Sequence, residues 1–557
     1  MVRISVEQAL RKAASYIKRG DLAEAHKLLS TLSNAFPDNK KVQKKLSGLN
    51  KIKERSEVHN PPHDEMLKLD GFFSAGLYRK VLQHSEILLK TYSNSAYLWN
   101  LVGICSALLG RFEQATDFFK KAISLAPDLP EPYKNLGAAL HDRGMHQDAI
   151  NILNTAIKLK PNYAEAYNNL GNALHALRNL DEAVAAYTKA LQLKPDYVDA
   201  SFNLGIVLNE IGQSVESIKF YQKAIALKPD HAEAHKNLAY TLLNFGKIEE
   251  GLREYEWRWK CKDFIGEYRD FTMPEWDGEK SLREKKILIW HEQGVGDTIN
   301  WSAYIPILKQ MSGCCVLECQ DKLIPILQRS FPDIEVRSSS AIDQNNYQGF
   351  DFHIPMGSLS RHLISSLPEI KNTPKYLYPD PDRVRFWSQR LKAIGNGPYI
   401  GVSWKSANTS FHRRPNYAPL SEWAPIFNLK NVTFINLQYI DFKQDIALIK
   451  DLFGVDVHNF EDLDHYDDIA DVAALCSALD CVVSTKVTVP LISSAVGTPT
   501  KLANWRQSVW NNILLNPLNN SAEIFECDSW TPWGPVFQSI ADDLTKLSAS
   551  RATMEYT

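Results

Sequence analysis

The sequence predicts two architectures in one chain of 557 residues: an α-helical solenoid followed by an α/β region with two parallel sheets. A motif recurs every 34 residues up to about residue 260, which is typical of stacked helical hairpins. From Lys285 onward, short runs rich in valine and isoleucine alternate with longer helical stretches, as in parallel sheets with crossover helices. The segment YLYPDPDRVRFW, with Pro379 and Pro381, divides this second region into two blocks and is predicted to be a hinge.

The repeated motif reads aromatic-x-x-Leu-Gly, then Gly, Ala, Ala and Pro. It is clearest in PYKNLGAALHDRGMHQDAINILNTAIKLKPN from Pro132 and in YNNLGNALHALRNLDEAVAAYTKALQLKPD from Tyr167. Small residues such as Gly137 and Ala149 allow two antiparallel helices to approach closely, and the proline ends the second helix. The pattern resembles the tetratricopeptide repeat, which implies a superhelical stack of helical hairpins. Units begin near 62, 96, 130, 164, 198 and 232, and a weaker unit spans about 6 to 39.

The remaining boundaries follow from shifts in composition. After the weak unit, KKVQKKLSGLNKIKERSEVHNPPH predicts a helix and then a break at Pro61 and Pro62. The predicted segments are a divergent repeat with its linker helix (1–60), the repeat array (62–260), a junction (261–284), a first lobe (285–390) and a second lobe with a C-terminal helix (395–557).

One polar column runs through the array. Asparagine occupies the same repeat position four times, at Asn135, Asn169, Asn203 and Asn237. In one interpretation these side chains steady the hairpins. In the other they clamp the backbone of an extended peptide acceptor, because an amide offers both a donor and an acceptor. The second interpretation resembles the asparagine ladder of O-linked N-acetylglucosamine transferases.

The end of the array is unusually aromatic. The segment GLREYEWRWKCKDF contains Tyr255, Trp257 and Trp259, whereas a capping repeat is usually polar on its outer face. We therefore expect the following domain to cover this surface.

The bulk composition excludes several classes of protein. With 44% hydrophobic and 23% charged residues and a formal net charge of −2, the chain has no basic field, so nucleic acid is not an expected partner. The N-terminal sequence lacks the apolar core of a secretory signal, and no apolar run approaches the roughly 18 residues of a transmembrane segment. Eight cysteines without a C-x-x-C pair predict buried thiols, no metal site and a cytoplasmic location.

Seven strands are predicted in the α/β region. They are KILIW near 286, CVLEC near 315, FDFHIP near 350, YIGVSW near 399, VTFINL near 432, VDVHNF near 455 and CVVST near 481. In open α/β sheets, ligands bind beyond the carboxyl ends of the strands. We therefore expect the two sheets to face each other across a cleft.

The stretch HEQGVGDTIN forms the first strand-to-helix turn of the first lobe. Gly294 and Gly296 permit close backbone approach or a positive φ, and Asp297 lies at or beside the start of the helix. The structural interpretation is a capped tight turn. The third glycine of a dinucleotide-binding fingerprint is absent.

A family resemblance gives this turn a second interpretation. KILIWHEQGVGDTINWSAYIPIL, GVSWKSA near 401, FINLQY near 434, DDIADVAALCSALDCVVS from 467 and SAVGTP near 494 together resemble glycosyltransferase family 9, the heptosyltransferase-like enzymes, in the subgroup fused to tetratricopeptide repeats. The resemblance covers most of residues 255–540. It implies the GT-B fold of two Rossmann-like domains, and transfer of a sugar from a nucleotide-sugar co-substrate without a metal or other cofactor.

The resemblance and the residues suggest roles for several side chains. Asp297 matches the family's Gly-Asp position, where the aspartate is a candidate base for the acceptor hydroxyl. Lys405, Arg413 and Arg414 follow a strand and suit the leaving diphosphate by charge and geometry. Gln438, at another strand end, is either a contact to the base or ribose of the nucleotide or a strand-end hydrogen-bonding group.

The last motif departs from the family pattern. In KVTVPLISSAVGTP, Lys486 stands at the acidic or amide position, Val487 at the threonine position and Leu491 at the histidine position. Residues near the start of the following helix remain candidates for holding a phosphate. They are Ser484, Thr485, Lys486 and Thr488. The same changes are equally compatible with lost donor affinity.

Two functions are compatible with these observations. The first is an inverting glycosyltransferase whose repeats position a protein, peptide or glycan acceptor. The second is a non-catalytic scaffold in which repeats bind a protein partner and a degenerate transferase domain serves as a platform. Both rest on analogy of architecture.

Overall fold

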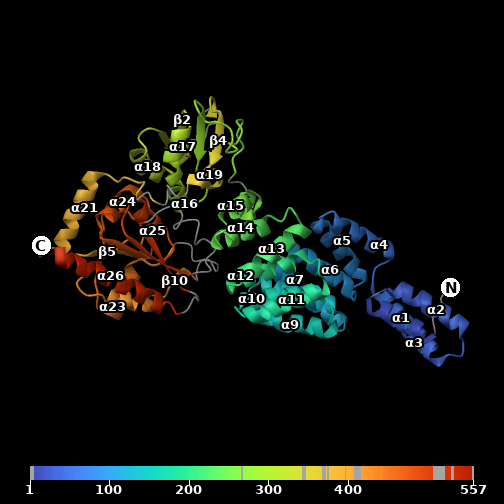
Figure 1. The fold of residues 1–557 in the computed structure, drawn as a ribbon. Coiled ribbons are helices and arrows are strands. Elements are labelled where there is room, and N and C mark those ends of the chain that lie inside the picture. Colours follow the sequence, from blue (N-terminus) through green and yellow to red (C-terminus); the bar gives the residue numbers. More distant parts are fainter. Residues whose placement is uncertain are drawn as a thin grey trace. The chain divides into compact units, whose positions relative to one another are not determined.

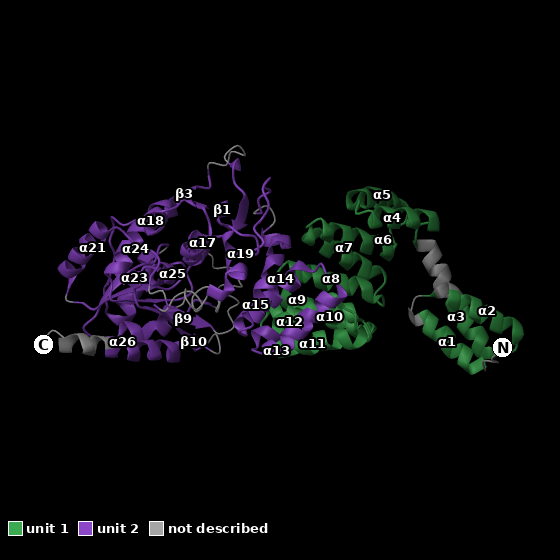
Figure 2. Cartoon of the chain, turned by 45° about the horizontal axis from the view of Figure 1, so that its top comes forward, with its two compact units in different colours: residues 1–207 green, residues 208–557 purple. Residues whose placement is uncertain are grey.

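The computed structural model divides into two compact units, Met1–Val207 and Leu208–Thr557, with the boundary inside helix α12 (Figure 2). It describes residues 6–19, 21–264, 268–340, 347–366, 372, 375–395, 397–406, 416–440, 442–505, 521–527 and 532–554.

The first unit is a series of helical hairpins that follows the predicted 34-residue register. Its helices are α1 (Val6–Arg19), α2 (Leu22–Ala35), α3 (Lys40–His59), α4 (His63–Ser74), α5 (Tyr78–Thr91), α6 (Ala96–Leu108), α7 (Phe112–Leu125), α8 (Pro130–Asp142), α9 (His146–Leu159), α10 (Ala164–Ala176), α11 (Leu180–Leu193) and α12 (Val198–Glu210), of which α12 continues into the second unit. The divergent N-terminal hairpin, the linker helix α3 and the break before α4 all lie where the sequence predicts them.

The glycine of each repeat permits the two helices of a hairpin to touch. A Cβ atom added at Gly137 would lie 2.4 Å from Leu153 Cγ, and one added at Gly171 would lie 2.5 Å from Tyr187 Cε1. Such distances are far shorter than van der Waals contact, so a larger residue would force the helices or the facing side chain to move. The close-approach role inferred for Gly137 is confirmed.

We expect Gly171→Ala to lower the free energy of unfolding by about 1–3 kcal/mol, because the new methyl group would overlap the Tyr187 ring. Gly71 provides a matched control, since it lies inside helix α4 with no atom within 4 Å of an added Cβ. There alanine should stabilise the helix by about 0.5–1 kcal/mol. Urea denaturation of both variants of the full chain measures the contrast. Equal effects of the two substitutions would contradict the packing role.

The second unit begins with the rest of the repeat array. Helices α13 (Ser214–Leu227), α14 (Ala232–Asn244) and α15 (Ile248–Tyr255) are followed by the short helices η1 (Glu256–Lys260) and η2 (Lys262–Phe264). Tyr255 is 2% exposed, and helices α14 and α15 contribute Ala239, Tyr240 and Tyr255 to the same apolar cluster as the first sheet. The expected covering of the aromatic junction by the next domain is therefore confirmed.

The first lobe contains a four-stranded parallel sheet in the order β3-β2-β1-β4. The strands are β1 (Lys286–Trp290), β2 (Cys314–Cys319), β3 (Glu335–Ser338) and β4 (Phe352–Pro355), and Leu288 pairs in register with Val316 and with His353. Its helices are α16 (Val295–Trp301), η3 (Ser302–Tyr304), α17 (Ile305–Met311), η4 (Asp321–Leu323), α18 (Ile324–Ser330), α19 (Met356–His362) and η6 (Ile364–Ser366). Cys315 and Cys319 are buried as predicted, whereas Cys314 is exposed at the start of β2.

The second lobe contains a six-stranded parallel sheet in the order β10-β9-β8-β5-β6-β7. Its strands are β5 (Tyr399–Ser403), β6 (Thr433–Asn436), β7 (Val457–His458), β8 (Cys481–Ser484), β9 (Thr500–Trp505) and β10 (Ala522–Cys527). Its helices are α21 (Pro381–Ile394), η8 (Leu420–Trp423), α22 (Ala424–Phe427), α23 (Phe442–Phe453), α24 (Ile469–Ala478), α25 (Val489–Ala495) and α26 (Gly534–Met554) (Figure 1). Apolar side chains cover both faces of the sheet, with Val482 on one side and Val483 on the other.

All seven predicted strands are present, and three further strands were not predicted. Strands β3 and β10 lie at sheet edges and carry exposed charged residues, so they lack the apolar run on which the prediction rests. Strand β9 is fully buried but contains Lys501 and Asn504. The charge of Lys501 is paired with Glu523 and Asp543, which explains how a lysine is accommodated inside the lobe.

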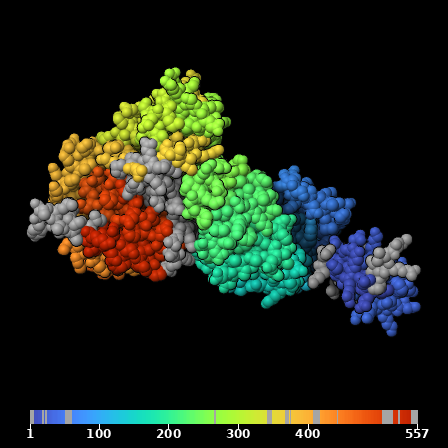
Figure 3. All heavy atoms as spheres, in the orientation of Figure 1, coloured from blue at the N-terminus to red at the C-terminus, as the bar shows by residue number. Residues whose placement is uncertain are grey.

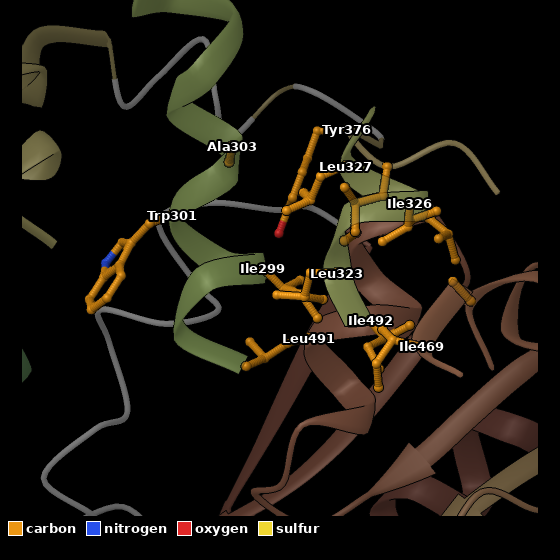
Figure 4. Close-up of a cluster of buried hydrophobic side chains, with 14 of the residues drawn as sticks. Ile299, Trp301, Ala303, Leu323, Ile326, Leu327, Tyr376, Ile469, Leu491 and Ile492 are labelled. Carbon is orange, nitrogen blue, oxygen red and sulfur yellow. The ribbon is translucent and has the colours of Figure 1, made fainter. Parts of the chain in front are cut away.

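One apolar cluster joins the two lobes (Figure 4). Ile299 and Leu323 of the first lobe pack in it with Ile469 and Leu491 of the second, and the lobe surfaces meet in the space-filling view (Figure 3). Within the segment predicted as a hinge, Tyr376 is buried in the same cluster, and its N–H donates to the Ala495 carbonyl at 3.0 Å. The prediction of two sheets facing across a cleft therefore needs a correction, because part of the space between the lobes is filled by this core.

Candidate functional site

The order of strands points to one edge of each sheet. In the first sheet the chain leaves β1 toward β2 on one side and returns to β4 on the other, and the same reversal occurs at β5 and β8. The second sheet thus has the order 3-2-1-4-5-6 of doubly wound nucleotide-binding sheets. Ligands of such sheets bind beyond the carboxyl ends of the strands where the order reverses.

In the first sheet, the chain's own charges lie at this point. Glu292, two residues after β1, is 2% exposed and accepts two hydrogen bonds from the fully buried Arg258, Nε to Oε2 at 2.7 Å and Nη2 to Oε1 at 2.9 Å. The Gly357 N–H at the start of α19 also donates to Glu292, at 2.6 Å. Arg258 comes from the aromatic segment that ends the repeat array, so the array and the first sheet share a buried ion pair.

Further polar groups complete this network. Arg258 donates to Ser358 Oγ at 2.9 Å and to Glu256 Oε1 at 3.0 Å, and its guanidinium stacks over the rings of Tyr255 and Trp259, each at 4.4 Å. Burial opposes the charged form of Arg258, but the carboxylates of Glu292 and Glu256 outweigh it and raise the pKa of Arg258 above its ordinary value. The sequence analysis did not single out Arg258 or Glu292. The only signals are a charged residue within an aromatic run and another just after a buried strand.

The GVGD turn is built as a helix cap. The Gly294 N–H donates to Asp297 Oδ2 at 3.1 Å at the start of α16, so the capped-turn interpretation describes the geometry. The positive φ, expected at a glycine, instead belongs to Gln293 at 61°, whose side chain donates to Tyr255 Oη at 3.3 Å. Just before the turn, burial and the nearby Arg269 lower the pKa of His291 to about 4, which leaves this ring neutral at pH 7.

Gly296 brings this turn against the second lobe. A Cβ atom added there would lie 2.9 Å from Leu491 Cδ1 and 3.5 Å from Thr488 Oγ1. Helix α16 therefore packs on the start of α25, and the half-buried Asp297 follows directly after the contact residue. The first lobe's predicted carboxylate and the second lobe's altered KVTVPL motif are neighbours in the structure.

The residues after β5 and β8 meet at the carboxyl edge of the second sheet. The Thr485 N–H donates to the Ser403 carbonyl at 3.1 Å, and Thr485 Oγ1 donates to the Trp404 carbonyl at 2.9 Å. The Ser484 hydroxyl donates to the Thr485 carbonyl at 2.8 Å. Since both side chains are fully buried with their hydroxyls bonded to backbone, they hold the loop together, while Lys486 and Thr488 are partly exposed.

Gln438 binds the backbone that carries Lys405. Its Oε1 accepts from the N–H groups of Trp404 and Lys405, each at 3.0 Å, and its Nε2 donates to the Lys405 carbonyl at 2.7 Å. Because Gln438 is fully buried, the structure agrees with the strand-end hydrogen-bonding interpretation. Lys405 Nζ lies 2.6 Å from Asp445 Oδ2. Arg413 and Arg414 lie outside the described residues.

The asparagine column makes hydrogen bonds within the array. Asn135 Nδ2 donates to Asn100 Oδ1 at 2.9 Å, and Asn237 Nδ2 donates to the Glu233 carbonyl at 3.0 Å. Asn203 Nδ2 donates to both Asn168 Oδ1, at 3.2 Å, and Asn172 Oδ1, at 3.0 Å, whereas Asn169 lies half-buried on α10. These bonds fit the interpretation in which the amides steady the hairpins. The peptide-clamping interpretation stays a prediction.

Comparisons with known proteins identify the repeats. Profiles described as tetratricopeptide repeats match residues 96–129, 164–197, 198–231 and 220–253, and a TPR repeat profile matches 139–178. The chain contains tetratricopeptide repeats. The tetratricopeptide repeats form the helical solenoid described above, and such repeats suggest protein partners.

The chain is also similar to several individual proteins. Protein FlbA of Caulobacter vibrioides (strain ATCC 19089 / CIP 103742 / CB 15) is 30% identical over 298 residues, which cover 50% of each protein. The chain thus spans about half the length of this curated relative. The crystal structure of MamA is 27% identical and covers 30% of this chain and 98% of that chain, with a TM-score of 0.27. For TTC0263, a thermophilic TPR protein in Thermus thermophilus, the values are 22%, 31%, 93% and 0.28.

Among the described helices, none has the length and apolar character required to span a bilayer.

Proposed function

We propose that the second unit binds a nucleotide sugar and transfers its sugar, by inversion and without a metal, to a protein, peptide or glycan acceptor recruited by the tetratricopeptide repeats. One observation supports this most strongly. The α16 turn that carries Asp297 packs on Thr488, and the loop of Thr488 is bonded through Thr485 to the backbone before Lys405. A carboxylate and two lysine-bearing loops therefore gather at the reversal point of a doubly wound sheet.

The chemistry of each group fits such a transfer. Asp297 serves as the base that takes the proton of the acceptor hydroxyl. Lys405 and Lys486 offset the charge that develops on the leaving diphosphate, with Arg413 and Arg414 as further cations. The first sheet binds no nucleotide in this proposal, because Arg258 and Glu292 lie at its reversal point.

Calorimetric titration of the full chain with UDP, GDP, ADP and CMP tests the binding step. We expect one of them to bind, and Lys405→Ala or Lys486→Ala to weaken that binding at least about tenfold, since each removes a charge-assisted contact. Lys450→Ala is the matched control. Lys450 lies in the same lobe and is also paired with an aspartate at 2.6 Å, on α23 away from both loops. Binding should be unchanged in this variant.

A second candidate is the non-catalytic scaffold, and one observation favours it. Leu491, which replaces the family's histidine, is 7% exposed and packs against Gly296 in the core shared by the lobes. This side chain contributes to packing and has no polar group for a donor. If no nucleoside diphosphate or nucleotide sugar binds the wild-type chain, the scaffold becomes the preferred function.

A further inference from the structure

Asn504 is a buried amide without a partner among the described residues. It lies near the end of β9 and is 1% exposed, yet neither its Nδ2 nor its Oδ1 makes a hydrogen bond within the part of the chain that the structure describes. A buried polar group that stays unpaired costs about 1–3 kcal/mol, so groups of this kind call for a functional explanation. Neither the family motifs nor the strand pattern assigns a role to Asn504.

The strand register places this amide at the proposed donor site. Ser484 of β8 pairs with Leu502, so Asn504, two residues further on, lies level with Lys486. Alternation along the strand puts Thr500, Leu502 and Asn504 on one face of the sheet. The hydroxyls of Thr500 and Ser493 are 2.7 Å apart, which identifies this as the face covered by α25.

The direction of α25 brings the amide close to the first lobe. Ser493, in the later part of this helix, lies beside Thr500 at the start of β9, so the start of the helix lies toward the other end of the strand, at the level of Asn504. The same helix start contacts Gly296, the residue before Asp297. Asn504 and Asp297 therefore flank the start of α25 from two lobes.

We infer that the Asn504 amide hydrogen-bonds a hydroxyl group of the donor sugar. This inference rests on the proposed function. In that reaction the sugar must lie between the diphosphate, held near Lys405 and Lys486, and the base Asp297, which acts on the hydroxyl that attacks the anomeric carbon. A sugar hydroxyl both donates and accepts, as the two ends of an amide do.

The test compares stability and binding in Asn504→Leu, with Asn504→Ala as a second variant in case leucine is too large for the site. The control is Asn436→Leu in the same sheet. Asn436 is fully buried, but its amide is bonded to Asn459 Oδ1 at 2.9 Å and to the Gln438 backbone at 3.0 and 3.2 Å. We expect Asn436→Leu to lower the Tm of the unliganded chain, whereas Asn504→Leu should leave it equal or raise it, because no internal bond is lost.

Calorimetry then separates the sugar from the nucleotide. The probes are UDP, GDP, ADP and CMP, together with UDP-glucose, UDP-N-acetylglucosamine, GDP-mannose and ADP-glucose. Both Asn504 variants should bind the preferred nucleoside diphosphate as the wild type does, and the preferred nucleotide sugar at least about tenfold more weakly. Equal affinity for the nucleotide sugar, or equal losses for both ligands, overturns the inference alone. Failure of the wild type to bind any probe overturns the proposed function, and this inference with it.

Discussion

Arg258→Ala is expected to lower the free energy of unfolding of the second unit by about 3–5 kcal/mol, because it leaves the buried Glu292 carboxylate without its partner. The loss extends to the bonds that Arg258 makes with Ser358 and Glu256, which connect the repeat array to the start of α19. Urea denaturation followed by tryptophan fluorescence measures the effect, since Trp290 and Trp301 are buried in this unit.

A double variant separates charge pairing from simple loss of packing. Arg258→Met combined with Glu292→Gln removes both charges and retains most of the volume, so its stability should lie well above that of Arg258→Ala. Arg253→Ala is a suitable control, because Arg253 forms an exposed pair with Glu249 on the nearby helix α15, and such pairs contribute about 1 kcal/mol or less. If Arg258→Ala unfolds like Arg253→Ala, the ion pair does not join the array to the first lobe.

Asp297→Asn is expected to reduce sugar transfer by roughly 100- to 10,000-fold, because an amide cannot accept the proton of the acceptor hydroxyl. Nucleotide binding should persist, since the proposed phosphate contacts come from the other lobe. The fold should also persist, because an asparagine oxygen can still accept the hydrogen bond from the Gly294 N–H. The measurement is initial rate of transfer from the nucleotide sugar that the wild type uses, at saturating donor.

Asp468→Asn controls for the loss of a negative helix cap. Asp468 accepts a hydrogen bond from the Asp471 N–H at 3.0 Å at the start of α24, and the proposed mechanism gives it no part. Its substitution should leave the transfer rate unchanged. Equal rates for Asp297→Asn and the wild type would show that Asp297 is only a cap.

Much of the fold could be predicted because its signals are local. The 34-residue spacing of small residues and prolines determined each hairpin, and apolar runs such as KILIW and YIGVS predicted the central strands. Edge strands and β9 escaped, because their burial depends on partners elsewhere in the chain. Lys501, for instance, is tolerated in β9 only because Glu523 and Asp543 lie against it.

The candidate site could be predicted in part, for a similar reason. The positions of Lys405, Gln438 and Asp297 follow from their places at strand ends. The ion pair of Arg258 with Glu292 joins two segments 34 residues apart, and its bond to Ser358 spans 100 residues, so no local pattern announces it. That Asn504 finds no partner among the described residues is likewise a property of the packed interior, visible only after the side chains around it are placed.

The central claim is that a nucleotide binds at the carboxyl edge of the second sheet, between the ends of β5 and β8. Hydrogen–deuterium exchange of the full chain, with and without the nucleoside diphosphate that binds best, tests it most directly. The account predicts slower exchange of the backbone amides at Trp404–Ser406 and Thr485–Thr488 when the nucleotide is bound. Unchanged exchange at both loops, or slowing confined to the ends of β1 and β4, would contradict it.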